Sequence, residues 1–302
     1  MPSLSAVRAS NAAFKPSYIP VALFVGGTSG VGQALAKAFA CITNGNAHII
    51  LCGRNKAAAE SIIASFPKPT SNGSLHEFVE CDVTLMKNIQ KTTSGLRSRS
   101  SKLNFLVLSP GVVSMAGRTE TEEGIDRKMA LHYYARWKFT NDLMPLLKKA
   151  KDAGEEASVM SILGPGRGGP MDVNDLGLKD TYTVANAAKA ANTYNDLMME
   201  SFAEQNPGIG FTHMHPGGVR TDILKNSQLP MKSLLELMAY PFTTAPEDAA
   251  QFMLHSLLEG GRQGGLFRRN PKAEDIGREK LFGGEEERKK LWEHTVEVPK
   301  VG

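Results

Sequence analysis

The stretch VALFVGGTSGVGQALAKAFACI, residues 21–42, decides the fold class. A short apolar run leads into closely spaced glycines, and an alanine-rich segment follows them. Glycines are needed where the backbone turns tightly after a strand and approaches a pyrophosphate, whose charge then lies at the N-terminus of the next helix. We therefore expect a buried strand, a nucleotide-binding turn at Gly26, Gly30 and Gly32, and a helix over 31–42.

Outward from this stretch, short aliphatic runs alternate with helical segments, which is typical of βαβ units around a mostly parallel sheet. Further strands are expected over 47–55, 76–83, 102–111, 156–163 and 209–217. Further helices are expected over 56–66, 123–150 and 183–204. The sequence has no internal repeat and no low-complexity linker, so a single domain of the α/β class is predicted.

The predicted domain spans residues 21–270, and the two ends of the chain differ from it. Residues 1–20 lack the apolar core of a secretory signal and are interpreted as an N-terminal arm, with a transit peptide as the alternative. Residues 271–302 are predicted to form a charged helix and C-terminal tail. Inside the domain, the Met- and Leu-rich segment 223–245 fits either a lid over an apolar substrate or a plain packing helix.

Composition excludes several classes of function. The chain has 302 residues, 41% hydrophobic and 22% charged, which are ordinary globular values. Its net charge of +4 comes from dispersed basic residues without interleaved aromatics, so nucleic acid is not an expected partner. The three cysteines lack metal-ligand spacing and are interpreted as core fillers in a reducing compartment. No apolar run approaches the ~18 residues of a membrane span, so the cytoplasm is the default location.

The end of the second strand bears on the choice of nucleotide. An acid at this point would accept a hydrogen bond from the adenosine 2′-hydroxyl and repel a 2′-phosphate. The sequence instead has Gly53 followed by Arg54, whose guanidinium can bind a phosphate through two donors. NADP(H) is therefore favoured over NAD, and the alternative is an Arg54 that only faces solvent. Asp82, at the end of the third strand, could accept from the adenine amino group.

At this point the sequence resembles the short-chain dehydrogenase/reductase family over roughly residues 20–270. The motifs that carry the resemblance, in family order, are GGTSGVG, CDVT, LVLSPGVV, TETEEGIDRKMALHYYARWKFTNDLMPLL, MDVNDLGLKDTY and HPGGVRTDIL. The fourth and fifth are especially similar to the branch that contains retinol-type dehydrogenases and many fungal relatives. The resemblance implies a doubly wound Rossmann domain with a parallel sheet of about seven strands flanked by helices. It also implies a nicotinamide cofactor.

The family's chemistry uses a tyrosine as general acid/base and a lysine that lowers the tyrosine pKa and holds the ribose. Aligning KAAN on that lysine keeps Lys189 but places Ala185 at the tyrosine position. Aligning on Tyr182 keeps the tyrosine but places Asn186 at the lysine position. On one continuous helix Tyr182 and Lys189 would stand about 10 Å apart along the axis. Direct pairing would require residues 180–183 to belong to the preceding loop and fold back.

Lys189 is predicted to hold the ribose, with Tyr182 entering from the loop as the proton donor or acceptor. The alternatives are a surface lysine and a loop tyrosine that shields apolar surface. His132 falls at the position of the family's relay asparagine and could replace it or act as an acid/base, or be a buried structural histidine. The family's serine position falls at Ser161 or Ile162, and Ser161 is predicted to bind the substrate oxygen because it alone carries a hydroxyl.

Asp172 follows the fifth strand and could bind a substrate amine or act as an acid/base, or could cap a turn. His213 and His215 point to one face of their strand, but no third ligand is marked by the sequence, so no metal site is predicted. Three further polar candidates are Arg118, Arg136 and Arg167.

The predicted cofactor contacts come from the glycine turn, the ends of the next three strands, the ribose lysine and the segment after the sixth strand, which the resemblance places at the nicotinamide carboxamide. They are Gly26, Thr28, Ser29, Gly30, Val31, Gly32, Arg54, Asn55, Asp82, Val83, Ser109, Gly111, Lys189, Pro216, Gly217, Val219 and Thr221.

These residues lead to one main hypothesis and two alternatives. The main hypothesis is an NADP(H)-dependent oxidoreductase that acts on a carbonyl or alcohol of an apolar small molecule, with secondary metabolism as the setting. The first alternative keeps the nucleotide but catalyses a cyclisation or isomerisation, in which His132 and Asp172 would matter more than Tyr182. The second is a nucleotide-binding protein without turnover. Family habit implies a homo-oligomer.

Overall fold

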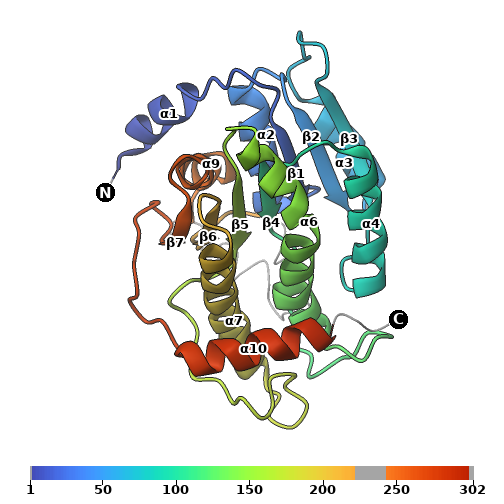
Figure 1. Cartoon of the computed structure of the whole chain (residues 1–302), viewed down its shortest axis with the longest axis vertical. Helices are drawn as coiled ribbons and strands as arrows, with labels where there is room; N and C mark the ends of the chain where they lie inside the picture. The colour runs from blue at the N-terminus through green and yellow to red at the C-terminus, as the bar shows by residue number, and fades with distance from the viewer. Residues whose placement is uncertain (1, 222–242, 299–302) are drawn as a thin grey trace.

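A seven-stranded parallel sheet forms the centre of the computed structural model, which describes residues 2–221 and 243–298 (Figure 1). The strand order is β3-β2-β1-β4-β5-β6-β7. The strands are β1 (Val21–Val25), β2 (His48–Gly53), β3 (Leu75–Glu80), β4 (Phe105–Leu108), β5 (Ser158–Ile162), β6 (Gly210–Met214) and β7 (Gly265–Arg269). The chain moves from β1 outward to β3 and then returns to β4 on the other side of β1, so the strand order reverses between β1 and β4. Ligands of such sheets bind at the carboxyl ends of the strands beside this switch.

Helices cover both faces of the sheet and follow the strands in sequence (Figure 1). They are α1 (Leu4–Ala12), α2 (Gly30–Ile42), α3 (Lys56–Ala64), α4 (Met86–Arg99), α5 (Arg127–Met129), the π-helical turn η1 (Ala130–Tyr134), α6 (Ala135–Asp152), α7 (Val184–Gln205), α9 (Pro246–Gln263) and α10 (Glu285–Glu297). The central strands β1, β4, β5 and β6 are buried along their whole length. Their sequences are therefore largely apolar, without strict alternation of polar residues.

The core has two layers, one on each face of the sheet. On one face, Ile89, Leu143, Leu197 and Leu291 come from α4, α6, α7 and α10. On the other face, Val7, Leu35, Ile62 and Leu254 come from α1, α2, α3 and α9. Successive residues of one strand enter opposite layers, as Leu23 and Phe24 of β1 do.

Both ends of the chain pack on this domain. In α1, Arg8 pairs with Asp248 at 2.7 Å, and the buried Asn11 donates to the Gln251 backbone oxygen at 2.9 Å. At the other end, α10 crosses α6 and α7 (Figure 1). Its Trp292 ring lies 5.5 Å from that of Trp137, centroid to centroid. The segments predicted as an arm and a tail thus contribute helices and buried side chains.

The predicted fold class is confirmed, and each predicted strand and helix is present with small differences in its ends. The sequence reading missed α1, α4, α9 and β7. In α4 the segment MKNIQKTTSGLRSR is mostly polar and buries only a narrow stripe, which weakens its periodic signal. One cysteine interpretation was wrong: Cys52 and Cys81 are buried, but Cys41 is exposed on α2. Of the predicted lid segment 223–245, residues up to 242 fall outside the described part of the chain.

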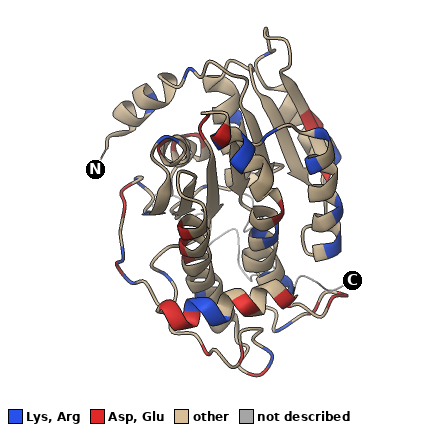
Figure 2. Cartoon of the chain, viewed as in Figure 1, with Lys and Arg blue, Asp and Glu red and all other residues tan. Residues whose placement is uncertain are grey.

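Charges of both signs are spread over the surface helices, and α10 carries blue and red residues along its length (Figure 2). This agrees with the dispersed basic residues of the sequence. Among the described helices none combines the length and apolar character needed to cross a bilayer. No group of three or more His, Cys, Asp or Glu side chains within residues 2–221 and 243–298 is arranged to hold a metal ion.

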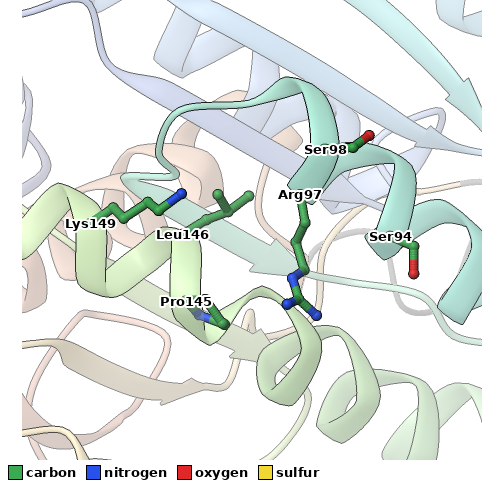
Figure 3. A pocket seen from close by; sticks show the side chains of 6 residues that line it. All are labelled: Ser94, Arg97, Ser98, Pro145, Leu146 and Lys149. Atoms are coloured by element: carbon green, nitrogen blue, oxygen red, sulfur yellow. The ribbon is translucent and has the colours of Figure 1, made fainter.

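A depression of about 440 Å³ lies between α4 and α6 (Figure 3). Its lining is Ser94, Arg97, Ser98, Pro145, Leu146 and Lys149. Leu103, just before β4 begins, donates to the Leu146 backbone oxygen at 3.0 Å. The depression is therefore near the amino ends of the strands, opposite the edge where the cofactor turn lies, and it is not the candidate site.

Candidate active site

The glycine turn between β1 and α2 is packed so closely that side chains are excluded. A Cβ atom at Gly32 would lie 2.3 Å from Ser109 Oγ and 2.5 Å from the Gly26 backbone oxygen. Gly26 also has a φ of +82°, which side-chain-bearing residues rarely adopt. Ser29 precedes α2 but its side chain makes no capping hydrogen bond. The Ser29 side chain therefore leaves the first amides of α2 uncapped. A helix N-terminus that binds a phosphate needs such uncapped amides.

Three other segments meet this turn. Ser109, after β4, donates from its hydroxyl to the Val25 backbone oxygen at 3.0 Å. Thr221, after β6, approaches Gly30, where an added Cβ would lie 3.6 Å from its side chain. At the end of β2, a Cβ at Gly53 would lie 3.0 Å from Thr28 Oγ1. The structure therefore brings the predicted cofactor segments of β1, β2, β4 and β6 to one edge of the sheet.

The predicted adenosine residues lie beside β2 and β3. Arg54 is exposed. Asn55 begins α3 and accepts from the Ala58 amide at 3.0 Å, so its side chain caps a helix. Asp82 accepts through Oδ1 from the amide and the hydroxyl of Thr84, at 3.0 and 2.8 Å. Val83 is buried.

The remaining predicted cofactor residues come from α7 and from the segment after β6. Lys189 is exposed, and its aliphatic stem runs beside Gly169, where an added Cβ would lie 3.2 Å from Cδ. Val219 forms an isolated parallel bridge with Thr244. Pro216 and Gly217 precede this bridge, and Gly217 has a φ of +81°.

Ser161 does not reach the site. It is fully buried within β5, where its hydroxyl donates to Asn195 Oδ1 and accepts from Arg136 Nη1, both at 2.7 Å. Asn195, on α7, in turn donates to the His132 backbone oxygen at 2.7 Å. This geometry argues against the predicted contact between Ser161 and a substrate. Ile162, the other residue at the serine position, is 4% exposed and carries no hydroxyl.

Arg136 is a buried cation that joins the ends of two strands. Besides Ser161 it donates to the backbone oxygens of Ile162 at 2.8 Å and Pro110 at 2.7 Å. Within the described chain no carboxylate pairs with it. Burial lowers the pKa of Arg136 to about 9, so the group remains charged at neutral pH. Its Nε also donates to the Leu131 backbone oxygen of η1 at 3.3 Å, so the cation links the ends of β4 and β5 to η1.

His132 lies in η1 beside the segment that follows β4. Its Nε2 accepts from the Val112 amide at 3.1 Å, so the ring proton sits on Nδ1. Part of its side chain is exposed, but protein surrounds most of the ring. This burial, followed by the charges of Arg136 and Lys128, lowers the pKa of His132 to about 3. The imidazole is therefore neutral at physiological pH.

Tyr182 lies in the loop before α7, which begins at Val184 behind the N-cap Thr183. Its hydroxyl accepts from Lys128 Nζ at 2.8 Å. Lys128 belongs to α5 and is 8% exposed. The sequence option in which residues 180–183 remain in the loop is thus the one that the structure adopts. The lysine that meets the tyrosine is Lys128, and Lys189 does not contact it.

Asp172, His213 and His215 each make local hydrogen bonds within the protein. Asp172 is exposed and accepts from the Asn174 amide at 2.9 Å, as a turn residue does. His213 is fully buried between Asp196 Oδ1 at 2.7 Å and the Gly164 amide at 3.0 Å. His215 bonds the Leu163 backbone oxygen through Nδ1 at 3.2 Å. Neither histidine belongs to a metal cluster among the residues described.

Comparison with known proteins agrees with this arrangement. A family model for short chain dehydrogenase matches residues 20–232. The chain belongs to the short-chain dehydrogenase family. Its members are nicotinamide-dependent oxidoreductases, and the protein is an oxidoreductase of this type.

Two fungal relatives and one solved structure illustrate the likeness. Oxidoreductase AN1596 of Emericella nidulans is 37% identical over 243 residues, which cover 80% of this chain and 71% of that protein. Oxidoreductase andH of Emericella variicolor is 32% identical over 258 residues, which cover 84% and 74% respectively. A short-chain dehydrogenase from Sphingobium yanoikuyae in complex with NADPH superposes with a TM-score of 0.59 at 16% identity, covering 82% of this chain and 87% of that one. The last likeness shows the fold alone.

Sequence reasoning on this short-chain dehydrogenase missed Lys128 and Asn195, and it gave Arg136 no role. Asn195 lies six residues after Lys189 on the same helix, and no motif marks it. Lys128 lies four residues before His132, the spacing of one helical turn, so it shares a face with a residue that the sequence did mark. That spacing was the available signal for Lys128.

Proposed function

We propose that this protein is an NADP(H)-dependent oxidoreductase that interconverts a carbonyl and an alcohol on an apolar small molecule. The observation that carries the proposal is a tyrosine hydroxyl held at the same sheet edge as the glycine turn. A proton donor for the substrate oxygen and a cradle for a dinucleotide are the two parts that such a reaction needs from the protein.

The residues at this edge fit a dinucleotide. The turn at Gly26, Gly30 and Gly32 would hold the pyrophosphate at the start of α2. A Cβ at Gly26 or Gly32 would clash with the residues packed around this turn. Lys189 would bind the ribose, and Pro216 with the segment that follows would border the carboxamide. When bound, the reduced nicotinamide supplies hydride to the carbonyl carbon.

NADP(H) is proposed over NAD for two reasons. Arg54 is exposed at the end of β2, with its guanidinium available to a 2′-phosphate. An acidic side chain at position 53 would favour the 2′-hydroxyl of NAD. Such a side chain would crowd Thr28, because a Cβ at position 53 would already lie 3.0 Å from Thr28 Oγ1. Asp82 keeps its second carboxylate oxygen for the adenine amino group.

The protein's own part in the reaction is proton transfer and positioning. Tyr182 gives its hydroxyl proton to the carbonyl oxygen or, in the reverse direction, takes it back. The neutral His132 holds the Val112 amide and so orients the loop after β4. Arg136 fixes the ends of β4 and β5 beneath this loop.

The proposed substrate is apolar and bulky, and the setting is secondary metabolism. The Met- and Leu-rich composition of segment 223–245 supports the apolar character, and the two fungal oxidoreductase relatives support the setting. A reducing cytoplasm is proposed because all three cysteines are free. A homo-oligomer stays a prediction from the family resemblance.

One observation favours the rival function, a cyclisation or isomerisation with bound nucleotide and no net redox change. With Lys189 aligned on the family's lysine, Ala185 takes the tyrosine position, and the Ser161 hydroxyl already bonds Arg136 and Asn195. His132 and Asp172 would then matter more than Tyr182.

The stoichiometry of NADPH consumption decides between the two functions. The purified protein is mixed with NADPH and a panel of apolar ketones, and loss of the NADPH absorbance is compared with alcohol formed. We expect one NADPH consumed per alcohol for at least one ketone. Tight NADPH binding by fluorescence without consumption, together with a rearranged product, would reject the oxidoreductase proposal and favour the rival.

A further inference from the structure

We infer that Lys128 is the positioning residue that prepares Tyr182 for proton transfer, and that Lys189 serves the ribose alone. The inference deepens the proposed function and rests on it. The two duties that the family resemblance assigns to one lysine would here be divided between α5 and α7.

The first observation concerns the hydrogen bonds of the Lys128 ammonium. Nζ donates to three oxygens: Tyr182 Oη at 2.8 Å, the Ala116 backbone oxygen at 2.7 Å and the Gly117 backbone oxygen at 3.2 Å. A lysine ammonium has three protons, so its donors are fully used. Two of the acceptors are neutral carbonyls. Among the described residues, Tyr182 is therefore the one partner of this cation that can become an anion.

The second observation is the direction of the hydrogen bond between Lys128 and Tyr182. Because Nζ donates to Oη, the phenolic proton of Tyr182 points elsewhere, and no other residue in the described chain accepts it. The side chain is only partly buried, so this proton can meet a substrate oxygen. The positive charge of the ammonium, 2.8 Å from Oη, would offset negative charge that develops on that oxygen as the proton leaves.

Tyr182 is held by anchors on both sides. Before it, the buried Asp175 accepts from the amide and the hydroxyl of Thr181, both at 2.8 Å. After it, Thr183 accepts from the Asn186 amide at 2.9 Å and caps α7. A catalytic group must keep its geometry within a fraction of an ångström, and these two anchors provide that order.

A path of close contacts joins the pair to the cofactor turn. A Cβ at Gly32 would lie 2.3 Å from Ser109 Oγ. Two residues after Ser109, a Cβ at Gly111 would lie 3.3 Å from His132 Nε2. His132 stands one turn from Lys128, whose charge lowers the pKa of the His132 ring together with burial and Arg136. The Lys128–Tyr182 pair therefore lies at the same edge of the sheet as the dinucleotide cradle.

Lys189 has a different environment. It is exposed, and none of the residues described accepts a hydrogen bond from its ammonium. It is thus free for a ribose hydroxyl but has no contact with Tyr182.

In the proposed step, a bound reduced nicotinamide would supply hydride for the new C–H bond, and the carbonyl π electrons would move to oxygen. That oxygen takes the proton of Tyr182, so the phenolic O–H bond breaks as the alcohol O–H bond forms. Lys128 would stabilise the phenolate that remains until a proton taken up from solution restores the phenol. The nicotinamide is oxidised by two electrons and the carbonyl is reduced by two.

The test compares five variants of the full chain, three of them at Lys128: Met, Gln and Arg. Lys128→Met removes the cation and its hydrogen bonds, and Lys128→Gln keeps an amide donor without the charge. Lys189→Met tests the ribose lysine. Arg127→Met is the matched control, because Arg127 is the exposed neighbour of Lys128 on α5. Each variant is measured for kcat and KM with the responsive ketone, for the NADPH Kd by fluorescence, and for melting temperature.

We expect Lys128→Met and Lys128→Gln to lower kcat by at least about 100-fold, with an NADPH Kd within about twofold of the unaltered protein. Lys128→Arg, which restores a cation, should recover part of kcat. Lys189→Met should raise the NADPH Kd by at least about fivefold. Arg127→Met should leave all three quantities unchanged.

A folded Lys128→Gln variant with unchanged kcat would overturn the inference, and so would loss of NADPH binding equal to that of Lys189→Met. If Lys128→Met does not fold, Lys128→Gln and Lys128→Arg decide the result. Absence of turnover in the unaltered protein, with NADPH bound, would instead reject the proposed function and the inference with it.

Discussion

The two halves of the candidate site differ in how their residues are constrained. At the β1–α2 turn, backbone atoms pack closely on each other, and a Cβ at Gly32 would lie 2.5 Å from the Gly26 backbone oxygen. At the β5–α7 segment, the functional groups are long side chains, and Lys128 from α5 reaches Tyr182 from a distant loop. Where the backbone is this closely packed, only glycine fits. A side chain with a given chemical role, by contrast, can come from any element that lies within reach. This difference accounts for a sequence that keeps the family's glycine pattern at the turn but not its Tyr/Lys spacing.

The largest expected effect is that of Tyr182→Phe, which removes the hydroxyl and keeps the ring. We predict a loss of kcat of about 10²–10⁴-fold with NADPH affinity unchanged, because the proton donor is lost and the cradle is not. Steady-state kinetics and fluorescence titration measure the two quantities. A variant with normal kcat would remove Tyr182 from the reaction and leave the proton-transfer half without a donor.

Gly32→Ala tests the cofactor half. The added methyl has no room, so we predict a loss of about 1–3 kcal/mol in the free energy of unfolding and a sharp loss of NADPH binding. Gly95→Ala is the matched control, because Gly95 lies within α4 with nothing within 4 Å of the added Cβ. This control should gain about 0.5–1 kcal/mol in denaturant unfolding. Equal behaviour of the two variants would show that the turn is not sterically constrained.

Arg54→Ala separates the two nucleotides. Loss of a charged hydrogen-bonding group from a 2′-phosphate should weaken NADPH by about 10–100-fold and leave NADH nearly unchanged. The measurement is a pair of fluorescence titrations. Equal weakening of both nucleotides would refute the proposed preference for NADP(H).

The smallest effect concerns pH and His132. Its pKa is lowered from 6.5 to about 3 in the folded protein by burial, Arg136 and Lys128. The unfolded chain therefore binds a proton that the folded chain does not, and the stabilisation present above pH 6.5 is lost as the pH falls toward 3. Between about pH 5 and 6 this one group should contribute a slope of about 1 kcal/mol per pH unit to the free energy of unfolding.

His132→Asn should reduce that slope, as measured by denaturant unfolding at several pH values. Other buried histidines, such as His213, have lowered pKa values and keep a residual slope in the variant. Identical slopes in the two proteins would mean that His132 takes up a proton as readily in the folded state as in the unfolded one.

Most of the fold could be predicted from sequence, because buried parallel strands are apolar runs and the glycine turn has one structural use. The elements that were missed have weaker local signals: α4 is polar and β7 ends in Arg268 and Arg269. In the site, Gly26, Gly30 and Gly32 were identified by a steric requirement that acts within a few residues. Lys128 was missed because its contact with Tyr182 spans 54 residues, and the spacing from His132 marks only a shared helix face.

The same distinction explains Ser161. Its residue type and strand suited a substrate contact, but the burial of a strand position and its partners Arg136 and Asn195 depend on how α6 and α7 pack against β5. Residue type therefore predicted the capacity for hydrogen bonding, and packing decided which groups use it.

The central claim is that the cofactor half is retained while the proton donor has moved to Tyr182 beside Lys128. A crystal structure with NADP⁺ and an alcohol that the enzyme oxidises tests this claim most directly. The account predicts the alcohol oxygen at about 2.6–3.2 Å from Tyr182 Oη, with Lys128 Nζ still on that hydroxyl and Lys189 on the ribose. An alcohol oxygen bound to other groups, with Tyr182 out of hydrogen-bonding reach, would contradict it.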